Sequence, residues 1–249
     1  MKIIFLGSGG WIPTFKRQTC SFLLITDRNL ILLDAGSGIW HLGNHTDLLK
    51  KYSKLDIIFS HYHLDHVMGL AFLPNWVKGL TLNIWGPGKK FYCNKCEDIL
   101  TQLTSSPYFS LPIQRFSDEV IINDYDLNGF NIGNLAVEIT AQQHSDPSFG
   151  ITVNGLLHYA TDTTVLKTTF EKARDVKLLL HECWDIDRVE KSEHSSLDEI
   201  EEMLSNYEVP LTGLIHINPN WGQSEFDKAI KRINGSKIFL ARDDIVVNL

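Results

Sequence analysis

The sequence predicts a mixed α/β fold of the α+β kind, in which two similar halves pack sheet on sheet with helices outside. The first observation behind this prediction is that each half begins with strands and continues as alternating strands and helices. The second is that no linker or low-complexity segment separates the halves. The third is size, because 249 residues with a 43% hydrophobic fraction can bury a sizeable core. We therefore expect one domain, 1–249, with halves at about 1–118 and 119–249.

The strands expected in the first half are short apolar runs that stop at glycine-rich or polar turns. Helices are expected at 41–52 and 89–103, and another begins within 65–69. Residues 105–112 form an apolar loop, which either closes over a site or makes a dimer contact. The expected strands are 2–6, 21–26, 30–34, 55–59 and 80–85.

The strongest turn signal of the second half is Asn154-Gly155, which lies between two apolar runs and predicts a hairpin. The helices expected in this half are 165–174, 196–207 and 224–233. The expected strands are 119–122, 130–132, 136–141, 151–153, 156–160, 176–180, 213–217 and 237–240.

The composition argues against several classes of protein. A formal net charge of −7 does not favour a broad nucleic-acid-binding surface, although a local basic patch stays open. Four cysteines are too few for a disulfide framework, and Cys93 and Cys96 have no second pair with which to complete a zinc site, so we expect free thiols. The N-terminal apolar run is too short for a signal peptide, and no run approaches the roughly 20 apolar residues of a membrane span. We therefore expect a cytoplasmic protein that contacts no membrane.

The segment 60–66 carries three histidines and a carboxylate within six residues: His61, His63, Asp65 and His66. All four are good ligands for a borderline metal such as zinc. They follow the expected strand 55–59, and α/β proteins build their sites at strand ends. His61 and His63 point the same way in an extended segment, whereas Asp65 and His66 follow a turn. We therefore expect two adjacent metals, each of which needs further ligands from elsewhere in the chain.

Three later residues lie at or just beyond the end of an expected strand and have suitable side chains: His144, Asp162 and His216. A carboxylate such as that of Asp162 can bridge two cations and hold them about 3.5–4 Å apart. Asp34 and Glu182 also follow strands. Each either orients a ligand from behind or simply ends its strand, and the sequence leaves both interpretations open.

With these residues the chain resembles the metallo-β-lactamase-fold hydrolase superfamily. The segments Leu6–Gly10 and Leu32–Gly36 also fit that family, so the resemblance covers nearly the whole chain. The resemblance implies a four-layer αββα sandwich with a dinuclear metal site at one edge of its sheets. It also implies that one metal is held by His61, His63 and His144, that the other is held by Asp65, His66 and His216, and that Asp162 bridges them. Zn²⁺ is the expected metal, although such a ligand set also accepts Mn²⁺ or Fe²⁺.

Within the superfamily the chain most resembles the branch of ribonuclease Z and the cyclic phosphodiesterases. His194, in Glu193–Leu197, matches a further histidine of that branch and is implied to contact phosphate or the leaving group. The pair His181-Glu182 also matches. Ribonuclease Z of the tRNA-processing type has a long arm before the bridging carboxylate, whereas only 17 residues separate His144 from Asp162 here. This departure argues for a substrate smaller than tRNA.

The expected activity is hydrolysis of a small or cyclic phosphodiester by a hydroxide held between two metals. Asp65 is expected to coordinate one metal and orient the hydroxide, and His194 to stabilise the departing group. Three alternatives stay open: a ribonuclease Z-like RNA endonuclease, a thioester or lactone hydrolase, and a metal-binding sensor or scaffold without turnover. The expected partner is a small phosphorylated substrate. Nucleic acid is not favoured, and homodimer formation is left open.

Overall fold

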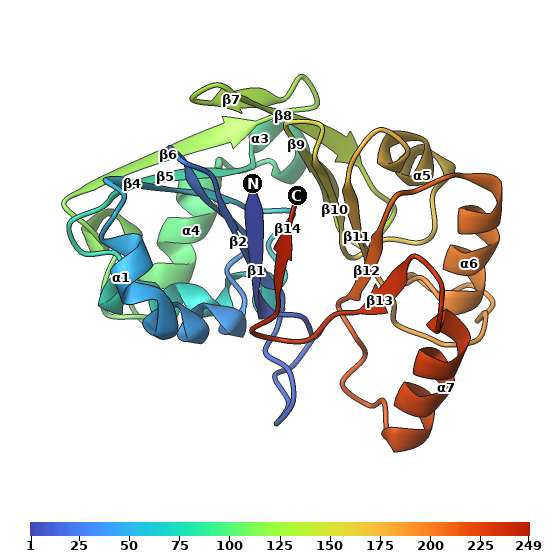
Figure 1. Ribbon diagram of the computed structural model, residues 1–249. Coiled ribbons are helices and arrows are strands. Elements are labelled where there is room, and N and C mark those ends of the chain that lie inside the picture. Colours follow the sequence, from blue (N-terminus) through green and yellow to red (C-terminus); the bar gives the residue numbers. More distant parts are fainter.

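Two seven-stranded sheets pack face to face in the computed structural model, which describes residues 1–249 (Figure 1). Helices α1 and α4 cover the outer face of the first sheet, and α5, α6 and α7 cover the second (Figure 1). The layers therefore run helix, sheet, sheet, helix. This arrangement confirms the expected αββα sandwich.

The first sheet has the order β14-β1-β2-β3-β4-β5-β6. Its strands β3 to β6 pair in parallel, so their carboxyl ends meet at one edge of the sheet. That edge receives both Asp34, which follows β3, and the segment 60–66, which follows β4. The strands are β1 Lys2–Gly7, β2 Ser21–Ile25, β3 Leu30–Leu33, β4 Lys54–Ile58, β5 Thr81–Pro87, β6 Glu119–Tyr125 and β14 Val246–Asn248.

The second sheet has the order β13-β12-β11-β10-β9-β8-β7. Strands β10 to β13 pair in parallel, and this again brings carboxyl ends together. Asp162, Glu182 and His216 lie at the ends of β10, β11 and β12, respectively. The strands are β7 Phe130–Ile132, β8 Leu135–Ala141, β9 Phe149–Val153, β10 Leu157–Ala160, β11 Leu178–Glu182, β12 Thr212–Ile215 and β13 Ile238–Leu240.

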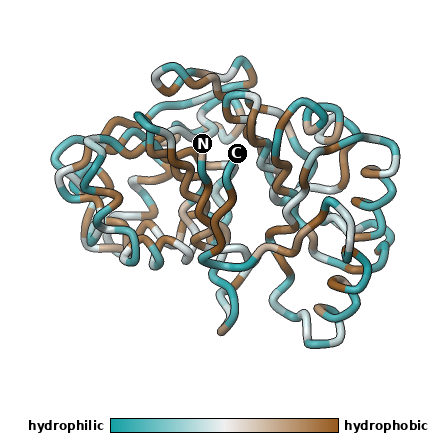
Figure 2. The backbone as a smooth tube through the Cα atoms, in the orientation of Figure 1, coloured by the Kyte–Doolittle hydropathy of each residue, from teal (hydrophilic) through white to brown (hydrophobic).

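The core between the two sheets is rich in aromatic side chains. Phe22 packs edge to face against Phe5 with ring centroids 5.2 Å apart, and against Tyr159 of the other sheet at 5.4 Å. All five residues of β2 are buried, because both faces of this strand are covered. Figure 2 shows the hydrophobic stretches concentrated in the central strands, whereas the outer helices carry both hydrophilic and hydrophobic stretches. The core therefore fixes the two sheets against each other.

Two helices of the first half are broken into shorter pieces than the sequence predicts. The helix expected at 41–52 is divided between the 3-10 helix Ser37–His45 and α1, and the helix expected at 89–103 is broken between α3 and α4. The break occurs because Cys93 adopts a left-handed conformation and the Asp124 carboxylate accepts the Cys96 N–H. None of the helices is both long and apolar enough to cross a membrane. The α-helices are α1 Thr46–Leu49, α2 Leu64–Val67, α3 Lys89–Tyr92, α4 Cys96–Thr104, α5 Lys167–Ala173, α6 Leu197–Asn206 and α7 Gln223–Ile233.

Two further expectations concern the cysteines Cys93 and Cys96 and the loop 105–112. Cys93 is exposed and Cys96 is buried, and neither forms a disulfide. In the loop 105–112, Phe109 and Leu111 pack against the core beneath the helices of the first sheet and do not line the cleft described below. Closure of this loop over the site of its own chain is therefore wrong for this structure.

The division between the sheets differs from the expected division at residue 118. Strand β6 lies beyond that boundary but pairs with β5 along its whole length, and so belongs to the first sheet. The sequence pattern did not reveal β14, which pairs with β1 because the two chain ends lie side by side (Figure 1). The single domain of residues 1–249 stays a prediction.

The interface between the sheets generates a stability prediction. Phe22→Ala removes an aromatic ring that both sheets contact, and we expect it to lower the free energy of unfolding by about 3–5 kcal/mol in urea denaturation. Phe15→Ala is the matched control, since Phe15 is fully exposed and its loss should change stability by less than about 0.5 kcal/mol. Equal effects of the two substitutions would contradict this description of the core.

Candidate metal centre

The seven expected ligands come from four separate segments and meet at the shared edge of the two sheets. The first sheet supplies the segment after β4, and the second supplies the residues after β8, β10 and β12. Parallel pairing explains the convergence, because the carboxyl ends of neighbouring parallel strands lie together. The residues that the structure brings together are His61, His63, Asp65, His66, His144, Asp162 and His216.

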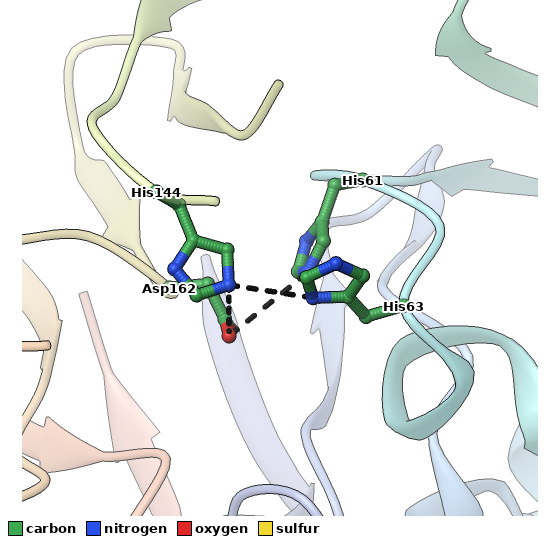
Figure 3. Close-up of side chains that lie close together, drawn as sticks. All are labelled: His61, His63, His144 and Asp162. Atoms are coloured by element: carbon green, nitrogen blue, oxygen red, sulfur yellow. Dashed lines mark hydrogen bonds and ion pairs between the residues drawn. The ribbon is translucent and has the colours of Figure 1, made fainter. Parts of the chain in front are cut away.

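One group of side chains consists of His61, His63, His144 and Asp162, whose potential ligand atoms all lie within 4.8 Å of one another (Figure 3). His144 Nε2 is 3.3 Å from His63 Nδ1 and 3.4 Å from Asp162 Oδ1. His61 Nε2 is 4.0 Å from the same oxygen. Each ring therefore directs one nitrogen towards a common point.

A second group consists of Asp65, His66 and His216, again with ligand atoms within 4.8 Å of one another. His66 Nε2 is 2.9 Å from Asp162 Oδ2, and His216 Nε2 is 3.2 Å from that oxygen. Asp162 thus presents Oδ1 to the first group and Oδ2 to the second. This is the arrangement of a carboxylate that can bridge two cations.

The donor set fits divalent cations. His61 Nε2 is buried and has no hydrogen-bond partner, although leaving such an atom unpaired costs about 1–3 kcal/mol. Burial lowers the pKa of His61 well below its usual value, which keeps a lone pair free. Burial opposes ionisation of Asp162, but the charges of His216 and His66 hold its pKa well below the usual range. A neutral imidazole such as His61 beside an ionised carboxylate such as Asp162 is the kind of ligand pair that divalent cations such as zinc prefer.

Asp34 orients the ligand His66 from behind. Its carboxylate accepts the His66 Nδ1–H at 2.7 Å, the Ser60 N–H at 2.7 Å and the Tyr159 hydroxyl at 2.6 Å. Donation from Nδ1 fixes the tautomer and leaves Nε2 of the ring facing the site. The geometry therefore favours the orienting interpretation of Asp34, which the sequence left open.

Glu182 has an equivalent position in the second sheet. This buried carboxylate accepts the Thr163 N–H at 2.6 Å and the His194 Nδ1–H at 2.8 Å, and lies 3.6 Å from His216 Nδ1. Burial alone would lower the pKa of His194, but the hydrogen bond and charge of Glu182 raise it above the usual 6.5. Glu182 therefore favours a protonated His194 and also contacts a candidate ligand.

His194 faces the site, as expected for a group that contacts substrate. Its ring stacks on Trp184 at 4.6 Å between centroids and lies 5.1 Å from the ring of His144. The next helix begins with a cap from Ser196, whose hydroxyl accepts the Glu199 N–H. The cap and the candidate substrate contact of this segment therefore fall on different residues.

The strand ends hold the side chains in place through unusual backbone conformations. Asp34, Asp162 and His216 have φ values of 53°, 46° and 50°, which are costly for residues other than glycine. Gly10 lies so close to His216 that a Cβ atom there would be 2.6 Å from the ring. Such strain persists only where the surrounding structure enforces it, and it is common at functional sites.

A cleft of about 440 Å³ opens onto the two groups. Trp184 lines it, whereas Trp221 is buried and donates its indole N–H to the Trp184 carbonyl. The sequence did not indicate Trp11, which lines the cleft and donates its backbone N–H to Asp65 Oδ2 at 2.8 Å. The signal in the sequence that could have indicated Trp11 is its position directly after the Gly7–Gly10 turn. The lining residues are Trp11, His63, Asp65, His144, Ser145, Asp162, Trp184, Glu193, His194 and His216.

The bridging position of Asp162 generates a prediction about metal binding. We expect Zn²⁺ at about 100 times its dissociation constant to stabilise the metal-free protein by about 2.7 kcal/mol, seen as a rise in Tm. Asp162→Asn should reduce this rise, because it removes the charge shared by both groups. Asp47→Asn, at an exposed position, is the matched control. The same rise in both variants would rule out a central role for Asp162.

Comparisons with known proteins agree with this geometry. The family model described as Anti-Pycsar protein Apyc1 matches residues 1–234. Ribonuclease Z of Thermococcus sibiricus is 26% identical over all of this chain and 96% of its own length. The metallo-β-lactamase fold protein YhfI from Bacillus subtilis superposes with a TM-score of 0.77 at 19% identity, covering 99% of both chains. A diphosphatase from the PhnP family superposes with a TM-score of 0.74 at 17% identity, covering 100% of this chain and 97% of its own.

These similarities confirm the superfamily and the branch that the sequence motifs indicated. The similarity to ribonuclease Z over the whole chain identifies it as a metallo-hydrolase. Since the family model spans nearly the whole sequence, the chain belongs to the Anti-Pycsar protein Apyc1 family within the metallo-β-lactamase fold.

Proposed function

We propose that this chain hydrolyses a small or cyclic phosphodiester with the help of two divalent cations. The observation that carries the proposal is Asp162, whose two oxygens face two separate groups of histidines. One cation would be held by His61, His63 and His144, and the other by Asp65, His66 and His216. Zn²⁺ is the favoured metal, and the same ligands accept Mn²⁺ or Fe²⁺. Cations so held neutralise phosphate oxygens and lower the pKa of water towards about 7.

The protein's own groups would position the reaction. Asp65 is fixed by the Trp11 N–H and by His216 Nε2, so its carboxylate has a defined direction in which to orient the attacking water. His194 reaches the same cleft with Glu182 behind it, and can donate a proton to the departing oxygen or a hydrogen bond to the phosphate. Trp184 stacks on the His194 ring and limits its rotation.

Two features of the chain support a small substrate. The residues between His144 and Asp162 form β9 and β10 of the second sheet, so no projecting arm is available there to grip a folded RNA. The net charge of −7 also disfavours a polyanion. The family model is described as an anti-Pycsar protein. This description supports the further proposal that phosphodiester hydrolysis by this chain counteracts Pycsar.

A second candidate function is cleavage of RNA. Similarity to ribonuclease Z along the whole chain favours it. Thioester or lactone hydrolysis at the same centre is supported only by the general ability of bound metal ions to activate water and polarise a carbonyl group.

A substrate panel tests the proposal. We expect the Zn²⁺-loaded protein to hydrolyse small cyclic phosphodiesters and bis(p-nitrophenyl) phosphate faster than precursor tRNA, thioesters or lactones. His61→Ala should abolish the phosphodiesterase activity, because it removes a ligand. A protein that cleaves only acyl substrates, or a fully active His61→Ala variant, would refute the proposal, and preference for tRNA would favour the second candidate.

The role of His194 is tested by the leaving group. His194→Ala should lower kcat by about 10²–10⁴ for a diester with an alkoxide leaving group, because that oxygen needs a proton. The loss should be much smaller for bis(p-nitrophenyl) phosphate, since nitrophenolate departs without one. Equal losses on both substrates would assign His194 to phosphate contact instead.

The proton on His194 should also affect the pH dependence of kcat. The raised pKa of His194 keeps the ring protonated to higher pH, so the loss of kcat that its deprotonation causes should appear on the alkaline side of that pKa. Glu182→Gln removes the charge that raises the pKa, and it should move the alkaline limb of the kcat profile to lower pH. An unmoved limb would show that another group titrates.

A further inference from the structure

His63 differs from His66 and His216 in the exposure of the carboxylate that contacts its ring. The side chains of Asp34 and Glu182, which support His66 and His216, are fully buried. His63 is instead 34% exposed, and its Nε2 lies 3.0 Å from an oxygen of Asp146, whose side chain is 59% exposed. The carboxylate behind His63 is therefore on the solvent-facing side of the site.

The contact determines which nitrogen of His63 faces the other ligands. A neutral imidazole has one N–H, and an ionised carboxylate can only accept. The proton must then sit on Nε2, which leaves the lone pair on Nδ1. That nitrogen is the one 3.3 Å from His144 Nε2, inside the first group (Figure 3).

The loop that carries Asp146 is held in place by the opposite half of the molecule. Pro147 restricts the residue before it to extended conformations. The Tyr92 hydroxyl donates to the Pro147 carbonyl at 2.5 Å, and the Tyr92 ring packs edge to face on Tyr62 at 5.1 Å. Tyr62 precedes His63 in the chain, so the same contacts fix both partners.

We infer that Asp146 is a positioning residue for His63, and that it sets the affinity of the cation position formed by His61, His63 and His144. The inference rests on the proposed two-cation function. Carboxylate–histidine–metal arrangements typically contribute 10- to 100-fold to metal affinity. The second position is enclosed by buried ligands, so Asp146 leaves it unaffected. The first position is consequently the one that exchanges its cation with solvent.

The test is a competition titration of the metal-free protein with Zn²⁺ against a chromophoric chelator, which needs no substrate. We expect two Zn²⁺ per chain in the wild type. Asp146→Ala should weaken one position by 10- to 100-fold and leave the other within about threefold. Asp146→Asn keeps a hydrogen-bond acceptor and should lie between the wild type and the alanine variant.

Glu193→Gln is the matched control, because it removes one negative charge from the same cleft. It should weaken binding less than Asp146→Ala does. If all three variants lose the same affinity, the effect is one of charge alone and the inference fails. It also fails if both positions weaken equally, or if metal-free Asp146→Ala melts below the wild type. A wild-type protein that binds no Zn²⁺ would refute the proposed function instead.

Discussion

Asp162 is a buried carboxylate with histidine nitrogens on two sides, and the rest of the site is arranged around it. An ionised carboxylate inside a protein is costly unless cations or donors surround it. Here His66 and His216 face one oxygen, while His144 and His61 face the other. These side chains come from both sheets, so the charge of Asp162 can be satisfied only when the two sheets are packed against each other.

The packing of the sheets and the geometry of the site are linked through single residues. Tyr159 contacts Phe22 across the inter-sheet core and donates its hydroxyl to Asp34, which in turn holds His66. Strain in the backbone at Asp34, Asp162 and His216 is maintained by these contacts. A rigid core therefore supports the direction of each candidate ligand, as a site that must hold two cations requires.

The sequence predicted much of the architecture because local patterns determine it. Apolar runs placed nearly every strand, and the order of strands and helices indicated two packed sheets. Strand β14 escaped prediction because its partner β1 lies at the other end of the chain, and pairing of this kind leaves no local signal. The break after α3 depends on the Asp124 contact to Cys96, again a tertiary effect.

The candidate site shows the same difference between features set by local sequence and features set by tertiary contacts. The seven residues that converge could be named from spacing and strand ends, since ligand types cluster visibly in 60–66 and recur after three strands. Trp11 and Asp146 could not be named, because their importance lies in a single contact each, to Asp65 and to His63. The identity of the substrate depends on such contacts, and no motif describes them.

The central claim is that Asp162 lies between two cations. Anomalous diffraction at the zinc edge from crystals of the Zn²⁺-loaded protein tests it most directly. The account predicts two peaks about 3.5–4 Å apart, with one oxygen of Asp162 on each. A single peak, or two peaks that Asp162 does not join, would contradict it.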